Sequence, residues 1–100
     1  MIISIAEDFS KCPGGRFSYD GPHSAEEFRD NILIPALRNN NKVIIKLDGT
    51  RGYSSCFLEE VFGGLFRNGI SIKDINKIKL ESSRKSLIKE IKIYMKKEGE

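Results

Sequence analysis

The sequence predicts an α/β fold: a small domain with a mostly parallel or mixed sheet of about four strands and about three helices. Three short apolar segments, at residues 2–6, 42–47 and 77–81, have the composition of β-strands. Segments with helical spacing of apolar residues separate them. The chain has 100 residues, of which 39% are hydrophobic, so it can build one core and not two. We therefore expect a single domain over residues 1–100, with a frayed tail at 96–100.

The strands differ in composition and in expected position. Residues 2–6 are β-branched, residues 42–47 are nearly all apolar as in a buried central strand, and residues 77–81 alternate between apolar and polar. Glycine and proline at 13–15 and 21–22 indicate turns, and a short further strand at 16–19 fits between them. Strands that alternate with helices predict right-handed βαβ units.

The first helix is expected over residues 25–37. Ser24 and Glu27 have the spacing of a capping box, in which each side chain bonds the backbone N–H of the other residue. Pro35 predicts a kink or an early end, because proline lacks the N–H that a helix interior uses.

A second amphipathic helix follows the loop at 48–53. Its apolar positions between 57 and 66 face inward, and Glu59, Glu60 and Arg67 face outward. The pair Gly63–Gly64 within it indicates close packing, since each glycine costs a helix about 1 kcal/mol relative to alanine. Residues 70–76 are expected to form a connection, and Ser82 or Ser83 to cap a last helix.

The charge pattern and the rare residue types exclude several classes of protein. The net charge is +3, and the excess lies between residues 73 and 97, where interspersed acids favour a solvated helix face over a nucleic-acid contact. No apolar segment approaches the roughly 20 residues of a membrane span, and no signal-peptide pattern is present, so we expect a cytoplasmic protein. Cys12, Cys56 and His23 lack metal-ligand spacing, and a disulfide is disfavoured. No metal or cofactor is expected.

Two loops carry candidate binding residues. Asp48 and Arg51 follow the central strand, at the end where open α/β sheets usually bind ligands, although they could also form an ion pair with each other. Gly14 and Gly15 precede Arg16 in a segment that could wrap an anion. That segment lacks the Lys-Ser/Thr of a phosphate-binding loop, so a turn with a structural or partner-binding Arg16 is favoured.

Residues 54–56 open the second helix. Ser54 and Ser55 are candidates for a helix cap, and also for a phosphoacceptor whose added charge would alter a binding surface. A strand, a loop and a cysteine at a helix start is the layout of cysteine phosphatases and rhodaneses, which need an anion-binding loop after the cysteine. The bulky, acidic residues 57–60 follow Cys56 instead, so we expect no enzymatic activity.

Several segments together resemble one family. They are residues 13–17, 20–29 and 33–37, and above all 47–65, with its Phe-Leu-Glu-Glu-Val-Phe-Gly-Gly-Leu string. The chain is similar over about residues 2–95 to the bacterial STAS-like domains of unknown function, distant relatives of sulphate-transporter and anti-sigma-factor-antagonist domains. The resemblance implies a small sheet packed against helices, with a functional helix start after a strand.

The resemblance also implies a kind of partner. In the antagonists, that helix start carries a serine that is phosphorylated by a histidine-kinase-like ATPase, and the phosphate breaks their complex. STAS-like members are often encoded beside, or fused to, ATPases of this type. Family members commonly have serine where this chain has Cys56, which leaves Ser54 and Ser55 as phosphoacceptor candidates.

The functional expectation is a regulatory module that binds a protein partner, plausibly such an ATPase. The candidate contact residues are Arg16, Asp48, Arg51, Tyr53, Cys56, Glu59 and Glu60. The alternative is a nucleotide- or nucleic-acid-binding module that uses Arg16, Arg51 and the basic C-terminal helix.

Overall fold

Three parallel strands form the centre of the fold. A computed structural model describes residues 1–96, so most of the expected frayed tail at 96–100 lies outside the described residues. β1 (Ile2–Ser4), β2 (Val43–Lys46) and β3 (Ile78–Glu81) lie in that order in the sheet. Ile45 of β2 pairs with Ile3 on one side and Leu80 on the other. The α/β class and the parallel sheet are confirmed, with three strands in residues 1–96 in place of about four.

The strand expected at 16–19 is the one that does not form. Ser18–Asp20 is a short 3-10 turn, η2. Its backbone is satisfied by side chains, because Asp20 accepts from the Phe17 N–H at 3.0 Å and Glu26 accepts from the Ser18 N–H at 3.0 Å. These local acceptors take the place of a neighbouring strand.

β1 is shorter than the expected strand at 2–6. The chain turns into η1 (Ile5–Phe9), a single π-helical turn. Ser4 starts this turn, since its hydroxyl accepts from the Glu7 N–H and its own N–H donates to Asp8 at 2.8 Å.

The helix between β1 and β2 runs through α1 (Ala25–Phe28), η3 (Arg29–Leu33) and α2 (Ile34–Asn39). The Ser24 hydroxyl caps it by accepting from the Glu27 N–H at 3.2 Å. Of the two outcomes expected at Pro35, a kink or an early end, the early end does not occur. The helix contains the π turn η3, which ends two residues before Pro35 and helps it to accommodate a residue without an N–H.

The helix between β2 and β3 has the same three-part form: α3 (Ser55–Leu58), η4 (Glu59–Gly63) and α4 (Gly64–Arg67). The expected connection at 70–76 contains a further helix, α5 (Ile72–Ile75), capped by the Ser71 hydroxyl. The number of helices therefore exceeds the expected three. Ser71 was the missed sequence feature, a capping serine before a short apolar segment.

The last helix, α6 (Lys85–Tyr94), begins without the expected serine cap. Arg84 is its N-terminal flanking residue, with no side-chain cap bond. Ser82 and Ser83 instead donate to Asp48, in the loop after β2.

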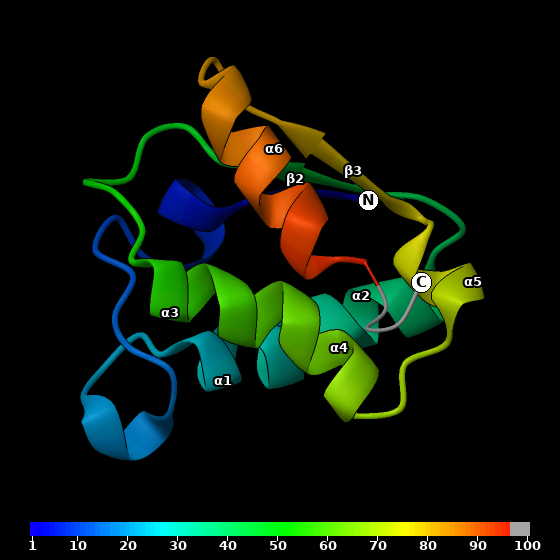
Figure 1. The fold of residues 1–100 in the computed structure, drawn as a ribbon, viewed down its shortest axis with the longest axis horizontal. Coiled ribbons are helices and arrows are strands. Elements are labelled where there is room, and N and C mark those ends of the chain that lie inside the picture. Colours follow the sequence, from blue (N-terminus) through cyan, green and yellow to red (C-terminus); the bar gives the residue numbers. More distant parts are fainter. Residues whose placement is uncertain (97–100) are drawn as a thin grey trace.

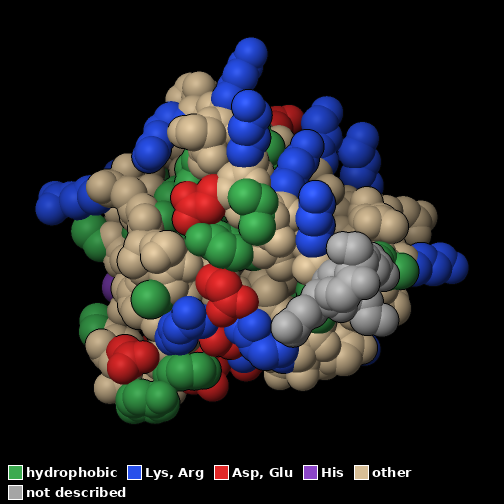
Figure 2. Space-filling view, in the orientation of Figure 1, with side chains coloured by type: hydrophobic (Ala, Val, Ile, Leu, Met, Phe, Trp, Pro, Cys, Tyr) green, Lys and Arg blue, Asp and Glu red, His purple; other side chains and the backbone are tan. Residues whose placement is uncertain are grey.

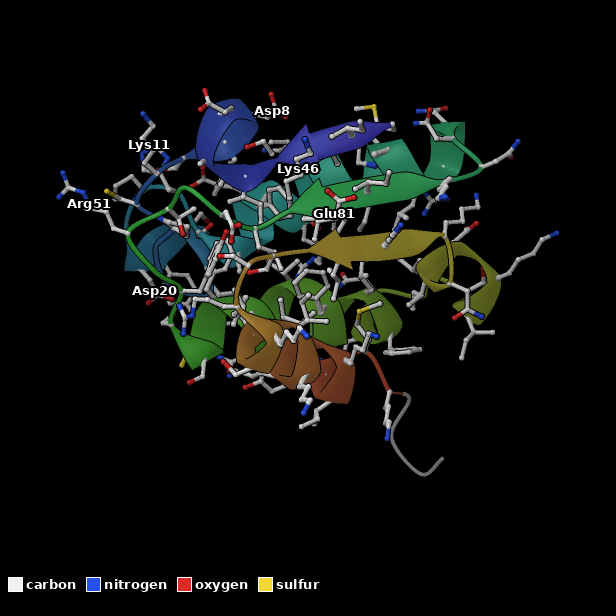
Figure 3. The ribbon with its side chains drawn as sticks, turned by 90° about the horizontal axis from the view of Figure 1, so that it is seen from above. Asp8, Lys11, Asp20, Lys46, Arg51 and Glu81 are labelled. Carbon is white, nitrogen blue, oxygen red and sulfur yellow. The ribbon has the colours of Figure 1, made fainter. Side chains whose placement is uncertain are left out.

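The helices cover one face of the sheet (Figure 1). Side chains on that face, including Ile3, Val43 and Ile45, are almost completely buried. On the opposite face Ile2 is 58% exposed, and Lys46 and Lys79 are exposed as well. Figure 3 views this open face, with Lys46 and Glu81 on neighbouring strands. None of the helices in residues 1–96 is long and apolar enough to cross a membrane.

The parallel arrangement determines where the candidate site lies. All three strands end at the same edge of the sheet, so η1, the 48–53 loop and the turn at 82–84 meet there. The helix at 55–67 starts from this edge as well, because the 48–53 loop leads directly into it.

Candidate functional site

The start of the helix at 55–67 presents three polar side chains, and we call residues 53–56 the Ser54 turn. Ser54 is the N-cap, since its hydroxyl accepts from the Phe57 N–H at 3.1 Å. Ser55 is the first helical residue, and both Ser55 and Cys56 are exposed. Ser54 therefore caps this helix start, and Cys56 lies in its first turn without a capping role.

Tyr53 anchors this turn to the sheet. Its hydroxyl donates to the Leu47 carbonyl at 2.6 Å, and its ring lies 5.9 Å from that of Phe57. Burial raises the pKa of Tyr53, so the phenol keeps the proton that it donates. Tyr53, a candidate partner contact, thus has a structural role in the loop.

Asp48 and Arg51 do not pair with each other within the described residues. The Asp48 carboxylate accepts from the Ser83 N–H at 3.0 Å and from the Ser82 hydroxyl at 3.0 Å. The Ser83 backbone bond, followed by that of the Ser82 hydroxyl, holds the pKa of Asp48 below its usual value. The Arg51 backbone N–H donates to the Lys11 carbonyl at 2.8 Å, while its exposed side chain points away from the protein (Figure 3).

An open depression of about 310 Å³ lies between the 48–53 loop and the start of α6. It occupies the carboxyl end of β2, where a ligand is expected in this class of fold. Its polar lining combines hydroxyl, carboxylate and guanidinium groups, which suits polar contacts with a partner better than burial of an apolar ligand. The lining residues are Leu47, Asp48, Gly49, Thr50, Arg51, Gly52, Tyr53, Ser83, Arg84 and Leu87.

Glu59 and Glu60 bind three arginines, and we call these five residues the Glu59–Glu60 cluster. Glu59 accepts from Arg16 at 2.5 Å and from Arg67 at 2.7 Å. Glu60 accepts from Arg29 at 2.5 Å, and both Arg16 and Arg67 reach it at 3.2 Å. The hydrogen bond from Arg67, then that from Arg16, keeps the pKa of Glu59 below its usual value.

The expectation that Glu60 faces outward is wrong. Glu60 is 5% exposed and Arg29 is 4% exposed, so their ion pair is buried between the two long helices. The π turn η4 contains Glu60, and the wider turn changes which side of the helix a residue faces. Gly64 leaves the space for this pair, because a Cβ there would lie 2.7 Å from the Arg29 guanidinium.

Arg16 ties the glycine-rich loop to this cluster. The Gly14 N–H donates to the His23 carbonyl at 2.8 Å, and the Gly15 carbonyl accepts from the Ala25 N–H at 2.8 Å. Gly14 also packs so closely on the Pro22 and His23 backbone that a Cβ would collide with it. The loop therefore serves packing, and the Arg16 guanidinium is already paired with two carboxylates.

Sequence inspection missed Arg29 and Arg67 as partners of the two glutamates. Arg29, Leu33 and Ala36 are spaced i, i+4, i+7, so Arg29 could have been placed on the buried face of its helix. The link from Asp48 to Ser82 and Ser83 spans more than 30 residues, and no local pattern indicates it.

Cys12 and Cys56 are both free and exposed.

The two adjacent glycines allow a matched test of the buried ion pair. Gly64→Ala should lower the free energy of unfolding by about 2 kcal/mol, because displacing a buried charge from its partner outweighs the gain of about 1 kcal/mol in helix propensity. Gly63→Ala should stay within about 1 kcal/mol of wild type, since its Cβ meets only the ends of the flexible and less buried Glu59 and Arg67 side chains. Urea denaturation measures both. Equal tolerance of the two substitutions would contradict the packing role of Gly64.

The Asp48 contacts predict a pH dependence of stability. A carboxylate whose pKa is lowered by folding stabilises the native state above the unfolded pKa of 3.8 and loses that effect as the pH falls through its folded value. Asp48→Asn should therefore be less stable than wild type at pH 7, and the difference should shrink towards pH 3. Thermal unfolding at several pH values measures it, with the exposed Glu7→Gln as control. A difference that is the same at pH 7 and pH 3 would argue against a charged Asp48.

Comparison with known proteins identifies the family. No curated protein and no solved structure matches the chain. The family model described as "STAS-like domain of unknown function (DUF4325)" matches residues 24–87. This range includes the Ser54 turn, Glu59 and Glu60, whereas Arg16 and most of α6 lie outside it. The match covers more than half of the chain, which therefore belongs to the STAS-like domains of unknown function.

Proposed function

We propose that this protein is a non-enzymatic, cytoplasmic regulatory module that presents the Ser54 turn and the adjoining 48–60 surface to a protein partner. The observation that carries the proposal is the exposure of Ser55 and Cys56 at a helix start whose surroundings are held firmly in place. The family match gives no function of its own, and the interaction role is proposed from the resemblance to anti-sigma-factor antagonists.

Three independent contacts hold this surface in place. Tyr53 bonds the Leu47 carbonyl, Asp48 bonds Ser82 and Ser83, and the arginines of the Glu59–Glu60 cluster hold the first turns of the helix. A surface that is ordered before binding loses less conformational entropy when a partner arrives. The exposed residues that remain for contact are Arg51, Ser55 and Cys56.

The surroundings of Cys56 support binding over catalysis. A cysteine enzyme of the phosphatase or rhodanese type needs an arginine to hold the substrate anion. Arg16 and Arg67 are each paired with Glu59 and Glu60, so both guanidinium groups already have carboxylate partners. A substrate anion would also meet those two carboxylates close to Cys56, which adds repulsion.

Ser55 is a better phosphoacceptor than Ser54. The Ser54 hydroxyl is occupied as the helix cap, and the Ser55 hydroxyl is exposed without a hydrogen bond to any described residue. The proposed partner is a histidine-kinase-like ATPase, as the resemblance to anti-sigma-factor antagonists implies.

A phosphate on Ser55 would leave the domain folded. The helix dipole favours it by about 0.3–1 kcal/mol, and Glu59, four residues further on, disfavours it by about 0.2–0.5 kcal/mol. These effects nearly cancel. The phosphate would therefore act on the partner, by placing about two negative charges on the contact surface, and would compete with Glu59 for Arg16 and Arg67.

A pull-down with a histidine-kinase-like ATPase from the same genome tests this function. Wild type should bind, and Ser55→Asp should bind at least tenfold more weakly, because a carboxylate imitates part of the phosphate charge. Ser86→Asp is the matched control, since Ser86 is an exposed serine in the first turn of α6, and it should bind like wild type.

The outcomes separate the two parts of the proposal. Equal binding by wild type and Ser55→Asp would contradict the phosphorylation switch. No binding by any of the three proteins would contradict the choice of partner.

A further inference from the structure

The outer face of α6 carries a row of lysines. Lys85, Lys89 and Lys92 are all exposed, and at 3.6 residues per turn they lie within an arc of about 60°. Lys96 follows four residues later and is exposed as well. Leu87 and Ile91 on the opposite side are buried in the core, so the orientation of this lysine row is determined by packing.

Positive charge is concentrated in α6 and in the residues just before it. Residues 77–96 contain seven Lys or Arg and two Glu, a net charge of +5, although the whole chain has only +3. Of the two acids, Glu90 lies on another side of α6 and accepts a hydrogen bond from the Tyr94 hydroxyl at 2.8 Å. Figure 2 shows Lys and Arg side chains gathered over α6.

No ion pair joins the lysine row to the Glu59–Glu60 cluster within residues 1–96, although Lys96 lines the same open depression as Glu59 and Arg67. Arg16 and Arg67 are paired with Glu59 and Glu60, so the inference rests on α6 alone and not on the alternative surface that also used Arg16 and Arg51. The α6 lysines form no salt bridge with any residue in the described part of the chain. Their charges remain available for a ligand.

The composition of this face favours a nucleic acid over a protein or a membrane. Protein interfaces depend on aromatic and arginine anchors and are poor in lysine. A helix that lies in a membrane inserts its apolar face, and the apolar residues Leu87 and Ile91 of α6 are buried in the core, with Ile93 exposed beside them. An extended row of lysines fits a repeating array of phosphates, which binds them through charge without a shaped pocket.

We propose that the lysine row on α6 binds the phosphate backbone of nucleic acid without sequence preference. Lys85, Lys89 and Lys92 span about 10 Å of helix, and a DNA duplex presents about six phosphate charges over that length. The ammonium groups displace condensed counterions, and the release of those ions drives binding.

The counterion mechanism determines the expected salt dependence. With about four phosphate contacts, the logarithm of the binding constant should fall with the logarithm of salt concentration at a slope of about −3.6, or roughly a hundredfold between about 50 and 200 mM salt. Fluorescence anisotropy with a labelled 20-base-pair duplex of arbitrary sequence measures this slope.

Matched triple substitutions identify the surface. Lys85→Gln, Lys89→Gln and Lys92→Gln together should weaken binding at least tenfold at about 50 mM salt and reduce the salt slope by about three. Lys11→Gln, Lys42→Gln and Lys73→Gln together remove the same charge from exposed positions outside α6 and should change binding less than threefold. Glutamine retains good helix propensity, and circular dichroism verifies that both variants are folded.

Three results would overturn the proposal. The first is the absence of duplex binding at about 50 mM salt, the second is an equal loss of binding in both triple variants, and the third is polyglutamate binding as tight as duplex binding. Binding to vesicles with about 30% anionic lipid, but not to the duplex, would assign the lysine row to membranes. Ser55→Asp should leave duplex binding unchanged, so this experiment can fail independently of the partner pull-down.

Discussion

The buried ion pair between Arg29 and Glu60 is the constraint on which the arrangement of the two long helices depends. Neither charge can be left without its partner at 4–5% exposure, because an unpaired buried charge costs several kcal/mol. Each residue lies in the π turn of its helix, and Gly64 provides the space beside them. One pair of charges thus determines how closely and in which orientation the helices meet.

The packing of the two helices also positions the surface that we propose for partner binding. The helix that buries Glu60 begins at Ser54, and Arg16 connects Glu59 to the glycine-rich loop. Asp48 and Tyr53 attach the preceding loop to its neighbours. The family match contains the helix start and both glutamates, which is consistent with an interaction surface built on a common scaffold. The lysine row on α6 takes no part in these contacts.

Local sequence patterns predicted the helices and strands better than they predicted which side chains contact each other. The class of fold, the parallel sheet and the positions of both long helices follow from apolar spacing and capping serines, since these depend on neighbours within a few residues. The prediction of a strand at 16–19 was wrong, because the Asp20 and Glu26 carboxylates accept hydrogen bonds from the backbone N–H groups of this segment. α5 was missed because its four residues, Ile72–Ile75, are too few to show a helical period.

By itself, the sequence determined that this is a small α/β domain of the STAS-like family with polar residues at a helix start after the central strand. Only the tertiary structure decided which of those residues are free to act. Ser54 proved to be the cap, Glu60 a buried counter-ion and Asp48 a link to Ser82 and Ser83. The physical reason is that a charged side chain takes its role from the partners nearest in space. For Glu60 and Asp48, the partners Arg29 and Ser83 come from segments more than 30 residues away.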